Sequence, residues 1–482
     1  MFDLRPVGYI IGLLLTVLGA AMLLPLGMDL LAGNGEWPVF LESAIITALT
    51  GTFLAISCAN GVGRGLTIRQ TFLVTTLVWL ILAIFAAVPF ILGDTQASIT
   101  DAFFESMSGL TTTGSTVFTG LEELPAGILL WRSLLQWMGG IGIVVVAMVF
   151  LPELRVGGMQ IFRSEAFDTL GKILPRAAEI AARITWIYLG LTFAAFLAFA
   201  AVGMTAFDAL CHALTAISTG GFSTTDASFG AHQGAPEYVA TVVMLLASLP
   251  FVRYIQLLAG TARPFFEDTQ IRAYFTVIGV TVAGLFLFQV FVDGLHPEQS
   301  FREAIFNVVS IISGTGFASV DYQLWGAVPV VVFFFLGLVG GCAGSTSCSV
   351  KIFRYQILLS AVRAQIRAIH SPHGMFLTRF DGRPVGPDVL NSVMAFFSIF
   401  VVSLGVLSIL LSMTGLDFTT SVSGAATAIA NIGPGLGDTI GPAGNFSTLN
   451  PTAKWLLAIA MLVGRLELLV VYAILTVNFW RS

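Results

Sequence analysis

Residues 101–115 read DAFFESMSGLTTTGS, and the pattern of this stretch recurs three times along the chain. The other copies read DALCHALTAISTGGF, EAIFNVVSIISGTGF and TSVSGAATAIANIGP, at residues 208–222, 303–317 and 420–434. The four copies align without gaps, and each is typical of a short helix followed by an extended Thr/Ser/Gly segment. One copy alone would be an ordinary turn, but four copies about a hundred residues apart indicate an internally repeated architecture.

Three positions are shared by every copy. A glycine lies near the end, a branched aliphatic residue precedes it by four positions, and a hydroxyl residue precedes it by six. The glycines are Gly114, Gly221, Gly316 and Gly433, the aliphatic residues are Leu110, Ile217, Ile312 and Ile429, and the hydroxyl residues are Ser108, Thr215, Ser310 and Thr427. Three copies open with an acid followed by alanine, which suits a helix N-terminus. The fourth opens with Thr-Ser, which we expect to cap the helix instead.

The sequence around these copies is that of a membrane protein. Of 482 residues, 56% are hydrophobic and only 10% are charged, whereas a soluble domain carries about 25% charged residues. The mean hydropathy is +0.91. Apolar runs of about 20 residues are long enough to cross a bilayer. They predict spans near residues 8–32, 41–62, 71–93, 131–151, 184–205, 237–259, 274–294, 327–350, 388–414 and 453–478.

Charge and cysteine content exclude other classes of protein. The formal net charge is −5, and no basic cluster indicates nucleic-acid binding. The four cysteines form neither a disulfide framework nor a CxxC pair. The chain also lacks HExxH, a serine nucleophile elbow and a His/Asp/Glu constellation, so we do not expect an enzyme.

Basic residues predict the orientation in the membrane. Most lie in four loops between predicted spans, at residues 64–69, 155–183, 263–272 and 351–383. If the chain crosses the membrane at each of the ten spans, these loops lie on the same side of the membrane as both termini. The opposite side retains Arg132, Arg302 and Lys454. By the positive-inside rule, both termini are expected in the cytoplasm.

Each copy of the repeat lies between two predicted spans, on the outer side of the membrane. The predicted fold is therefore an all-α polytopic membrane protein. Four units of helix, re-entrant pore helix, filter loop and helix surround one pore, and two extra N-terminal transmembrane helices stand outside the repeat. The expected segments are residues 1–66 for the extra helices and 67–155, 156–262, 263–372 and 373–482 for the four pore repeats.

The composition of the repeat suits a cation pore. A cation such as potassium must exchange its hydration shell for equivalent oxygens, which rings of backbone carbonyls supply. Glycine permits the unusual dihedrals that turn carbonyls inward. Irregular backbone is tolerated at membrane depth where it lines a cavity or is buried in protein. Each short helix would also direct its partly negative C-terminus toward the pore.

Several motifs resemble those of the TrkH/KtrB/HKT superfamily of potassium transporters. The segments TTTGS, STGGFS, SGTGFAS and NIGPGLG are similar to its four filter loops. Three further stretches resemble its second helices: LLQWMGGIGIVVVAMVFLP at 134–152, GLVGGCAGSTSCSVKIFR at 337–354 and MLVGRLELLVVY at 461–472. The two extra N-terminal spans favour the TrkH branch.

The resemblance implies a potassium ion in the filter and no covalently bound cofactor. In this superfamily, serine at the first filter glycine is associated with sodium permeability, so Gly114 favours potassium, with rubidium and caesium as further permeant ions. The implied filter residues are Thr111, Thr112, Thr113, Gly114, Ser218, Thr219, Gly220, Gly221, Ser313, Gly314, Thr315, Gly316, Asn431, Ile432 and Gly433.

The resemblance also implies an intramembrane gate below the filter. Independently of family, the glycines and small polar residues of 340–350 favour a flexible loop over a helix. Where the family usually has Gly-Gly, this chain has Cys348 and Ser349. The implied gate residues are Gly340, Gly341, Cys342, Ala343, Gly344, Ser345, Thr346, Ser347 and Arg465.

Arg465 lies in the middle of the last predicted span. A charge there costs at least ~2.5–3.5 kcal/mol, so it should face a cavity or a partner. The family places this residue under the filter, as a barrier to cations. Glu467 is two residues away and hence on another helix face, so we do not expect the two to pair.

Two transport mechanisms fit the sequence. The first is a channel-like potassium uptake subunit in the bacterial inner membrane. The second is a symporter that couples potassium to protons or sodium, although inverted repeats would alternate in orientation. The chain lacks a P-loop and a GxGxxG motif, so nucleotide control must come from elsewhere. The family implies a homodimer and a cytoplasmic TrkA-like nucleotide-binding ring, which we expect to dock on residues 152–183 and 351–386.

Overall fold

The computed structural model of the protein describes residues 3–61, 66–150, 154, 157–161 and 177–481, which are mostly helical. Within these residues, seven helical segments are long and apolar enough to span a membrane: Arg5–Ala32, Trp37–Cys58, Ile68–Leu92, Ala126–Met148, Glu179–Ala201, Thr269–Val292 and Pro387–Met413. Two bent helix pairs, Ala235–Leu258 and Pro451–Leu475, bring the possible number to nine. The predicted all-α polytopic membrane fold is confirmed.

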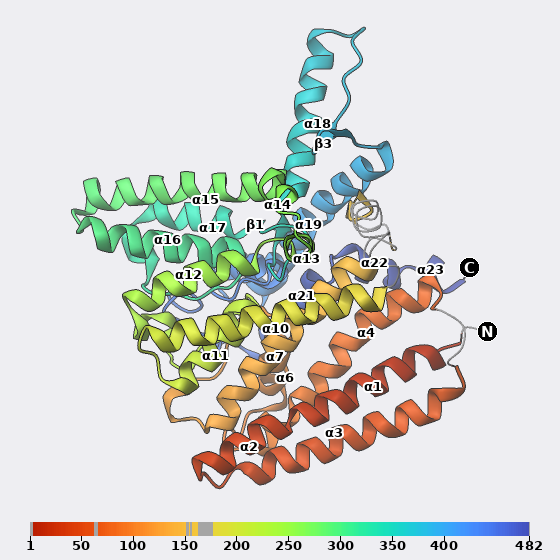
Figure 1. Ribbon diagram of the computed structural model, residues 1–482, viewed down its shortest axis with the longest axis vertical. Coiled ribbons are helices and arrows are strands. Elements are labelled where there is room, and N and C mark those ends of the chain that lie inside the picture. The colour runs from red at the N-terminus through yellow and green to blue at the C-terminus, as the bar shows by residue number, and fades with distance from the viewer. Residues whose placement is uncertain (1–2, 62–65, 151–153, 155–156, 162–176, 482) are drawn as a thin grey trace.

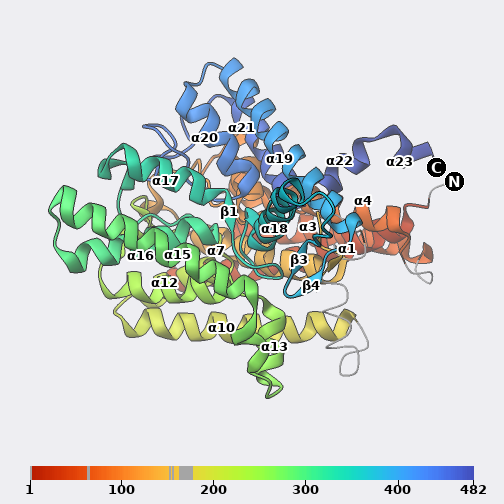
Figure 2. The same ribbon diagram turned by 90° about the horizontal axis from the view of Figure 1, so that it is seen from above.

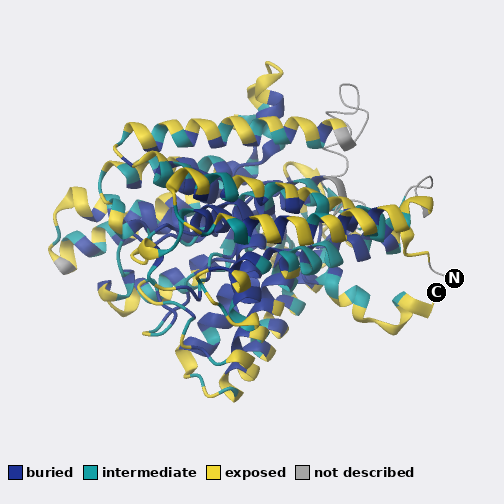
Figure 3. Cartoon of the chain, turned by 90° about the horizontal axis from the view of Figure 1, so that it is seen from below, coloured by how far each residue is buried: buried dark blue, intermediate teal, exposed yellow. Residues whose placement is uncertain are grey.

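The outer faces of the long helices are apolar. Val401, Val402, Val406 and Ile409 are all more than half exposed along one of them, Pro387–Met413. Figure 3 shows exposed residues along the outside of the molecule and buried residues at its centre. An exposed apolar surface of this extent suits contact with lipid.

The two extra N-terminal helices pack through glycines. They are α1 (Arg5–Ala21), which α2 (Leu23–Ala32) continues, and α3 (Trp37–Cys58), which a 3-10 turn (Ala59–Gly61) follows. A methyl group added to Gly12 would lie 2.5 Å from the backbone nitrogen of Ala55, and one on Gly51 would lie 2.6 Å from that of Thr16. Small residues at these positions therefore allow α1 and α3 to approach closely, as is common between membrane helices.

The first two units of the repeat follow. Unit one contains α4 (Ile68–Ala86), α5 (Val88–Leu92), the pore helix α6 (Ile99–Leu110), a 3-10 turn (Leu121–Glu123), and α7 (Ala126–Val145), which ends in a π turn (Val146–Phe150). Unit two contains α10 (Ala177–Ala201), the pore helix α11 (Ala206–Ile217), a 3-10 turn (Ser228–His232), α12 (Ala235–Ala247) and α13 (Phe251–Leu258).

The last two units repeat the order of long helix, pore helix and second helix, with short strands added. Unit three contains α14 (Arg263–Glu267), α15 (Thr269–Phe288), a π turn (Gln289–Asp293), the pore helix α16 (Pro297–Ser313), a 3-10 turn (Tyr322–Trp325), α17 (Ala327–Gly337), β1 (Val339–Gly340), β2 (Val350–Lys351) and α18 (Ile352–His370). Unit four contains β3 (Arg379–Phe380), β4 (Arg383–Pro384), α19 (Pro387–Met413), the pore helix α20 (Phe418–Ala430), α21 (Pro451–Arg465), α22 (Leu469–Leu475) and α23 (Val477–Arg481). The predicted boundaries between segments stay predictions, and the one between 155 and 156 lies outside the described residues.

The second helix of three units is broken, although the sequence predicts a break in only one. Helices α12 and α13 meet at 89°, where Pro250 cannot donate a backbone hydrogen bond. Helices α21 and α22 meet at 110°, and Glu467 and Leu468 between them have positive φ angles. The predicted break is the one within the apolar run 327–350, where α17 ends at Gly337 and an irregular loop follows.

That loop brings the chain back beside its own start, running in the same direction. Strands β1 and β2 pair in parallel at its two ends, Val339 with Val350 and Gly340 with Lys351. Beyond it, α18 runs across the direction of α10 and α15 and extends away from the body of the molecule (Figures 1 and 2). The two ends of the chain lie near each other, away from the pore helices (Figure 1).

Candidate functional site

The four pore helices begin at polar caps. Ser98, Thr205 and Asp417 each accept a hydrogen bond from a backbone N–H of the first turn of α6, α11 and α20. The expected Thr-Ser cap of the fourth copy is therefore wrong, because Asp417 lies three residues earlier. Hydrogen bonds from Thr420 lower the pKa of Asp417, so it stays ionised at the positive end of the helix dipole.

The pore helices are buried at the centre of the protein. All residues of α6 from Ala102 to Leu110 are buried, and so are Leu214–Ile217, Val308–Ser313 and Gly424–Ala430 at the ends of the other three. Each helix ends three or four residues before its repeat glycine. The predicted filter residues therefore start where four helix C-termini converge.

Each filter loop has two left-handed residues. The repeat glycines have φ angles of +87°, +78°, +79° and +102° for Gly114, Gly221, Gly316 and Gly433. The residues two positions earlier also have positive φ: 52° at Thr112, 51° at Thr219, 78° at Gly314 and 53° at Asn431. Three of these four are not glycine, so the loops hold an unfavourable conformation at matching positions. This second position was not visible in the sequence.

The four loops form a closed ring. A methyl group added to Gly114 would overlap the carbonyl oxygen of Gly220, one on Gly221 that of Thr315, and one on Gly316 that of Ile432. A methyl group on Gly433 would lie 2.9 Å from the carbonyl oxygen of Thr113. Each glycine thus meets the carbonyl of the residue before the glycine of the next unit, and the fourth unit returns to the first. The structure brings together all four groups of predicted filter residues.

On the face of the ring that the sequence predicts to be the outer one lies a cavity of about 490 Å³, the outer cavity. All four repeat glycines line it, as do the acidic residues Asp226 and Asp438. Carboxylates in such a cavity raise the local concentration of cations.

On the opposite face of the ring, the predicted inner face, the loop between β1 and β2 contacts all four units. The N–H of Cys342 donates to Ser248 of unit two (3.1 Å), and the N–H of Cys348 donates to Ser313 of unit three (3.4 Å). The N–H of Ser349 donates to Ala430 of unit four (2.9 Å). The Cys348 thiol lies 3.5 Å from the Thr112 hydroxyl of unit one. The loop therefore lies directly beneath the ring.

The predicted gate residues divide into two groups. Gly340–Gly344 anchor the loop to units three and two. The Ala343 N–H donates to the Gln270 side chain (3.0 Å), and the Gly344 carbonyl accepts from the Phe251 N–H (2.9 Å). Ser345 and Ser347, with Cys348, line a space of only about 30 Å³ below the ring, enough for one or two water molecules. Cys348 was not among the predicted gate residues, and it lies nearest the ring.

Arg465 lines the same small space from the end of α21. Its Nη1 donates to the Cys348 sulfur (2.7 Å) and to the Thr346 carbonyl (3.4 Å). Nε and Nη2 are buried and have no hydrogen-bond partner among the described residues. Glu467 pairs with Arg354 and not with Arg465, as expected, although it lies in the break after α21 and not on another face of the same helix.

Comparisons with known proteins identify the family. The family model for TrkH, described as a cation transport protein, matches residues 37–479. The chain belongs to the TrkH family of cation transport proteins. The resemblance inferred from the sequence is confirmed.

Several members of this family are similar over most of their length. The Trk system potassium uptake protein TrkI of Halomonas elongata is 45% identical over 86% of this chain and 84% of that protein. The Trk system potassium uptake protein TrkH of Escherichia coli K12 is 34% identical over 99% of both chains. The crystal structure of the potassium transporter TrkH from Vibrio parahaemolyticus superimposes with a TM-score of 0.90 at 33% identity, covering all of both chains.

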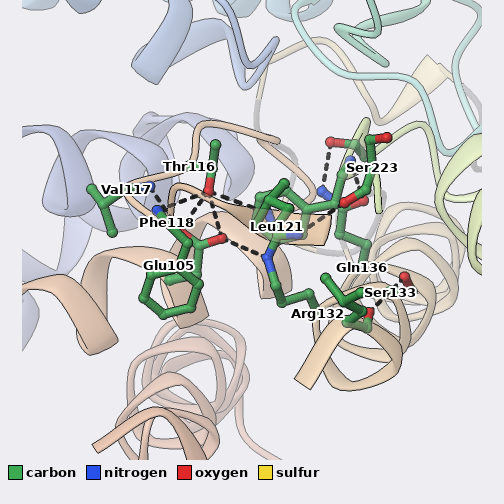
Figure 4. Close-up of polar contacts among 12 residues, drawn as sticks. Glu105, Thr116, Val117, Phe118, Leu121, Arg132, Ser133, Gln136 and Ser223 are labelled. Carbon is green, nitrogen blue, oxygen red and sulfur yellow. Dashed lines mark hydrogen bonds and ion pairs between the residues drawn. The ribbon is translucent and has the colours of Figure 1, made fainter. Parts of the chain in front are cut away.

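In this member of the TrkH family, sequence reasoning missed a polar cluster behind the first two loops. Arg132 of α7 and Glu105 of α6 form a buried ion pair, with Nε and Oε1 2.8 Å apart (Figure 4). Glu105 also accepts from the Thr116 hydroxyl (2.9 Å) and the Val117 N–H (2.9 Å). Arg132 donates to the Ser223 carbonyl (2.9 Å), which follows the second repeat glycine. The pair thus connects the segments that follow the repeat glycines of loops one and two.

Glu105 occupies a position that also matches between units. It lies nine residues before its repeat glycine, and the same position holds His212 and Asn307 in units two and three. His212 lies 3.1 Å from the Ser223 hydroxyl, and Asn307 donates to the Ser319 hydroxyl (3.1 Å). Each side chain hydrogen-bonds to the segment that follows the repeat glycine of its own loop. A polar residue at this position in three units was the signal available in the sequence, but its chemistry differs between them and unit four has Gly424 there.

Proposed function

We propose that the chain is the potassium-selective, ion-translocating subunit of a Trk-type potassium uptake system. The observation that carries the proposal is the closed ring of four loops, in which one carbonyl per unit occupies a matching position next to a left-handed glycine. A ring of carbonyls replaces the hydration shell of potassium. The names of the similar proteins, which describe potassium uptake and transport, support potassium as the cation.

Potassium is the transported substrate, and the filter residues named above hold it as it passes. Rubidium and caesium, which are larger alkali cations, are proposed as further permeant ions. The four pore helices end at the ring, so their partly negative C-termini favour a cation there. No covalently bound cofactor and no enzymatic activity form part of the proposal.

The loop 340–347 and Arg465 are the proposed gate. The small space below the ring and the contacts of this loop with all four units support a closed inner side. A guanidinium group in that space would also repel a cation leaving the ring. Channel-like flow is the first mechanism, and symport with protons or sodium is the alternative.

The proposed assembly is a homodimer in the bacterial inner membrane, with a TrkA-like ring on its cytoplasmic side. Residues 351–386 include α18, which extends beyond the body of the molecule (Figure 1) and so offers a docking surface. The other proposed docking region, residues 152–183, lies largely outside the described residues. The basic loops support cytoplasmic termini.

Flux measurements on the purified protein in liposomes test the proposal. Potassium gradients should drive rubidium uptake when sodium and proton gradients are both absent, and sodium should compete poorly. Uptake that requires a sodium or proton gradient would instead favour the symporter. Equal uptake of sodium and rubidium would contradict a potassium-selective ring.

A further inference from the structure

Helix α7 makes the ring of filter loops asymmetric. Arg132 and Gln136 lie seven and eleven residues after Pro125, the N-cap of α7. Gln136 donates to the Gly220 carbonyl (2.6 Å) and accepts from the Phe222 N–H (3.0 Å), on both sides of the second repeat glycine. One helix of unit one therefore holds the loop of unit two with two polar side chains.

The second helices of the other units have no such contact. The corresponding residues are Thr241 and Leu245 in α12, Phe333 and Gly337 in α17, and Leu457 and Met461 in α21. Within the described part of the chain, none of these side chains hydrogen-bonds a filter loop, and the Thr241 hydroxyl donates within its own helix (2.7 Å). Loops four and one are joined directly, through Asn431 to Thr113 (2.8 Å) and Ser115 to Gly433 (2.8 Å). Among the described residues, a connection made by side chains at these two positions of a second helix is found between units one and two.

The charges of the connection are balanced and buried. Arg132 and Glu105 are 1% and 0% exposed, and every Glu105 oxygen has a hydrogen-bond donor. The Arg132 guanidinium also lies over the Phe222 ring, 4.2 Å from its centroid. Arg132 borders the outer cavity, so Glu105 cancels a positive charge that would otherwise face incoming cations.

We propose that Arg132 and Glu105 form a positioning pair that fixes the spacing of the first two filter loops and so sets the preference for potassium over sodium. A ring discriminates between cations of equal charge only while its carbonyls keep their arrangement. The pair holds Thr116, Val117 and Ser223, which lie two or three residues beyond the ring glycines. The inference rests on the proposed function.

Two variants distinguish the positioning role of the Arg132–Glu105 pair from the effect of its charges. Glu105→Gln keeps the shape but loses the Val117 acceptor and leaves Arg132 uncompensated. We expect a higher apparent KM for rubidium and a rubidium-over-sodium preference reduced about tenfold, as for loss of one hydrogen bond to a charged group. The double variant Glu105→Gln/Arg132→Met removes the charge, so its KM should return toward wild type while the reduced preference remains. Replacing a whole buried ion pair is usually tolerated by folding.

Glu237→Gln is the matched control. Glu237 forms another buried ion pair, with Arg302, which connects α12 to α16 away from the filter loops. This variant should lower the thermal unfolding midpoint but retain the wild-type preference. Rubidium uptake in competition with sodium, and unfolding of the same preparations, are the measurements.

Three results would overturn the positioning role. They are a folded double variant with wild-type preference, an equal loss of preference in Glu237→Gln, and failure of the double variant to fold. A wild-type protein without preference would refute the proposed function instead, so the two failures are distinguishable.

Discussion

The two faces of the glycine ring differ in volume and in what lines them. The outer face opens into about 490 Å³ lined by backbone, hydroxyl, aromatic and acidic groups and by Arg132, which Glu105 neutralises. The inner face has about 30 Å³, bordered by Cys348, Lys351 and Arg465 and by Glu467, which pairs with Arg354. In the proposed function, the outer face accepts a hydrated cation, whereas the inner face opposes its exit by sterics and by charge. Selection then belongs to the ring and obstruction to the loop below it.

The faces also differ in how they are held. On the outer face, a buried ion pair and side-chain amides fix the loops from behind. On the inner face, backbone hydrogen bonds of the β1–β2 loop reach the broken ends of neighbouring helices, and two guanidinium nitrogens of Arg465 lack partners among the described residues. A segment held in this way can rearrange at lower cost than the ring, which suits a gate.

The largest effect is expected from shortening the inner loop. Deleting Gly344–Ser347 removes the residues that fill the space below the ring, so flux should become constitutive while selectivity is retained. Rubidium uptake without any cytoplasmic partner is the measurement. Deleting residues 371–374, an exposed segment after α18, is the control of equal length. Loss of flux from a folded deletion variant would make the loop a structural support.

Removing the inner charge should have the next largest effect. Two unit charges about 8 Å apart interact by roughly 2 kcal/mol at an effective dielectric near 20, which exceeds a tenfold change in rate. Arg465→Ala should therefore raise potassium flux at least about tenfold. Arg465→Lys, which keeps the charge, should stay near wild type. Unchanged flux through a stably folded Arg465→Ala protein would refute the electrostatic barrier.

A side chain added to a glycine of the ring should weaken the preference for potassium over sodium. Gly114→Ser places a Cβ against the Gly220 carbonyl and should reduce rubidium-over-sodium preference by about tenfold, since one of four carbonyl positions is displaced. Gly120→Ser is the control, because Gly120 also has a positive φ but an added Cβ meets nothing within 4 Å. Equal preference in both variants would exclude Gly114 from the filter.

The smallest effect is expected at Cys348. Cys348→Ala removes the sulfur acceptor of Arg465 but leaves the Thr346 carbonyl and the charge below the ring. Flux should rise by a factor of about five, the equivalent of one hydrogen bond near 1 kcal/mol. Cys348→Ser, which keeps an acceptor, should change it less. A larger increase than in Arg465→Ala would mean that the thiol itself is the main obstruction.

The sequence predicted the ring because its determinants are local. Glycine spacing, helix length and hydropathy follow from neighbouring residues, and all four copies led to Gly114 and its equivalents. The loop at 340–350 was also recognised from its poor helix formers.

The missed features depend on contacts between distant segments. The pairing of Arg132 with Glu105 requires the packing of α7 against α6, and the break after Arg465 has no proline to mark it. The positive φ angles at Thr112, Thr219 and Asn431 occur where the pore helices end against the ring formed by the other units. No pattern in a single stretch encodes such a constraint.

Combining Gly114→Ser with Arg465→Ala tests the separation of selection from obstruction most directly. Rubidium flux and rubidium-over-sodium preference would be measured for the wild type, both single variants and the double variant in the same liposomes. If the ring selects and the inner face obstructs, the effects add in free energy. Arg465→Ala then raises flux by the same factor in both backgrounds, and Gly114→Ser lowers preference by the same factor in both. A rubidium-over-sodium preference that changes with Arg465→Ala alone would contradict this separation of selection from obstruction. So would a flux increase that vanishes in the Gly114→Ser background.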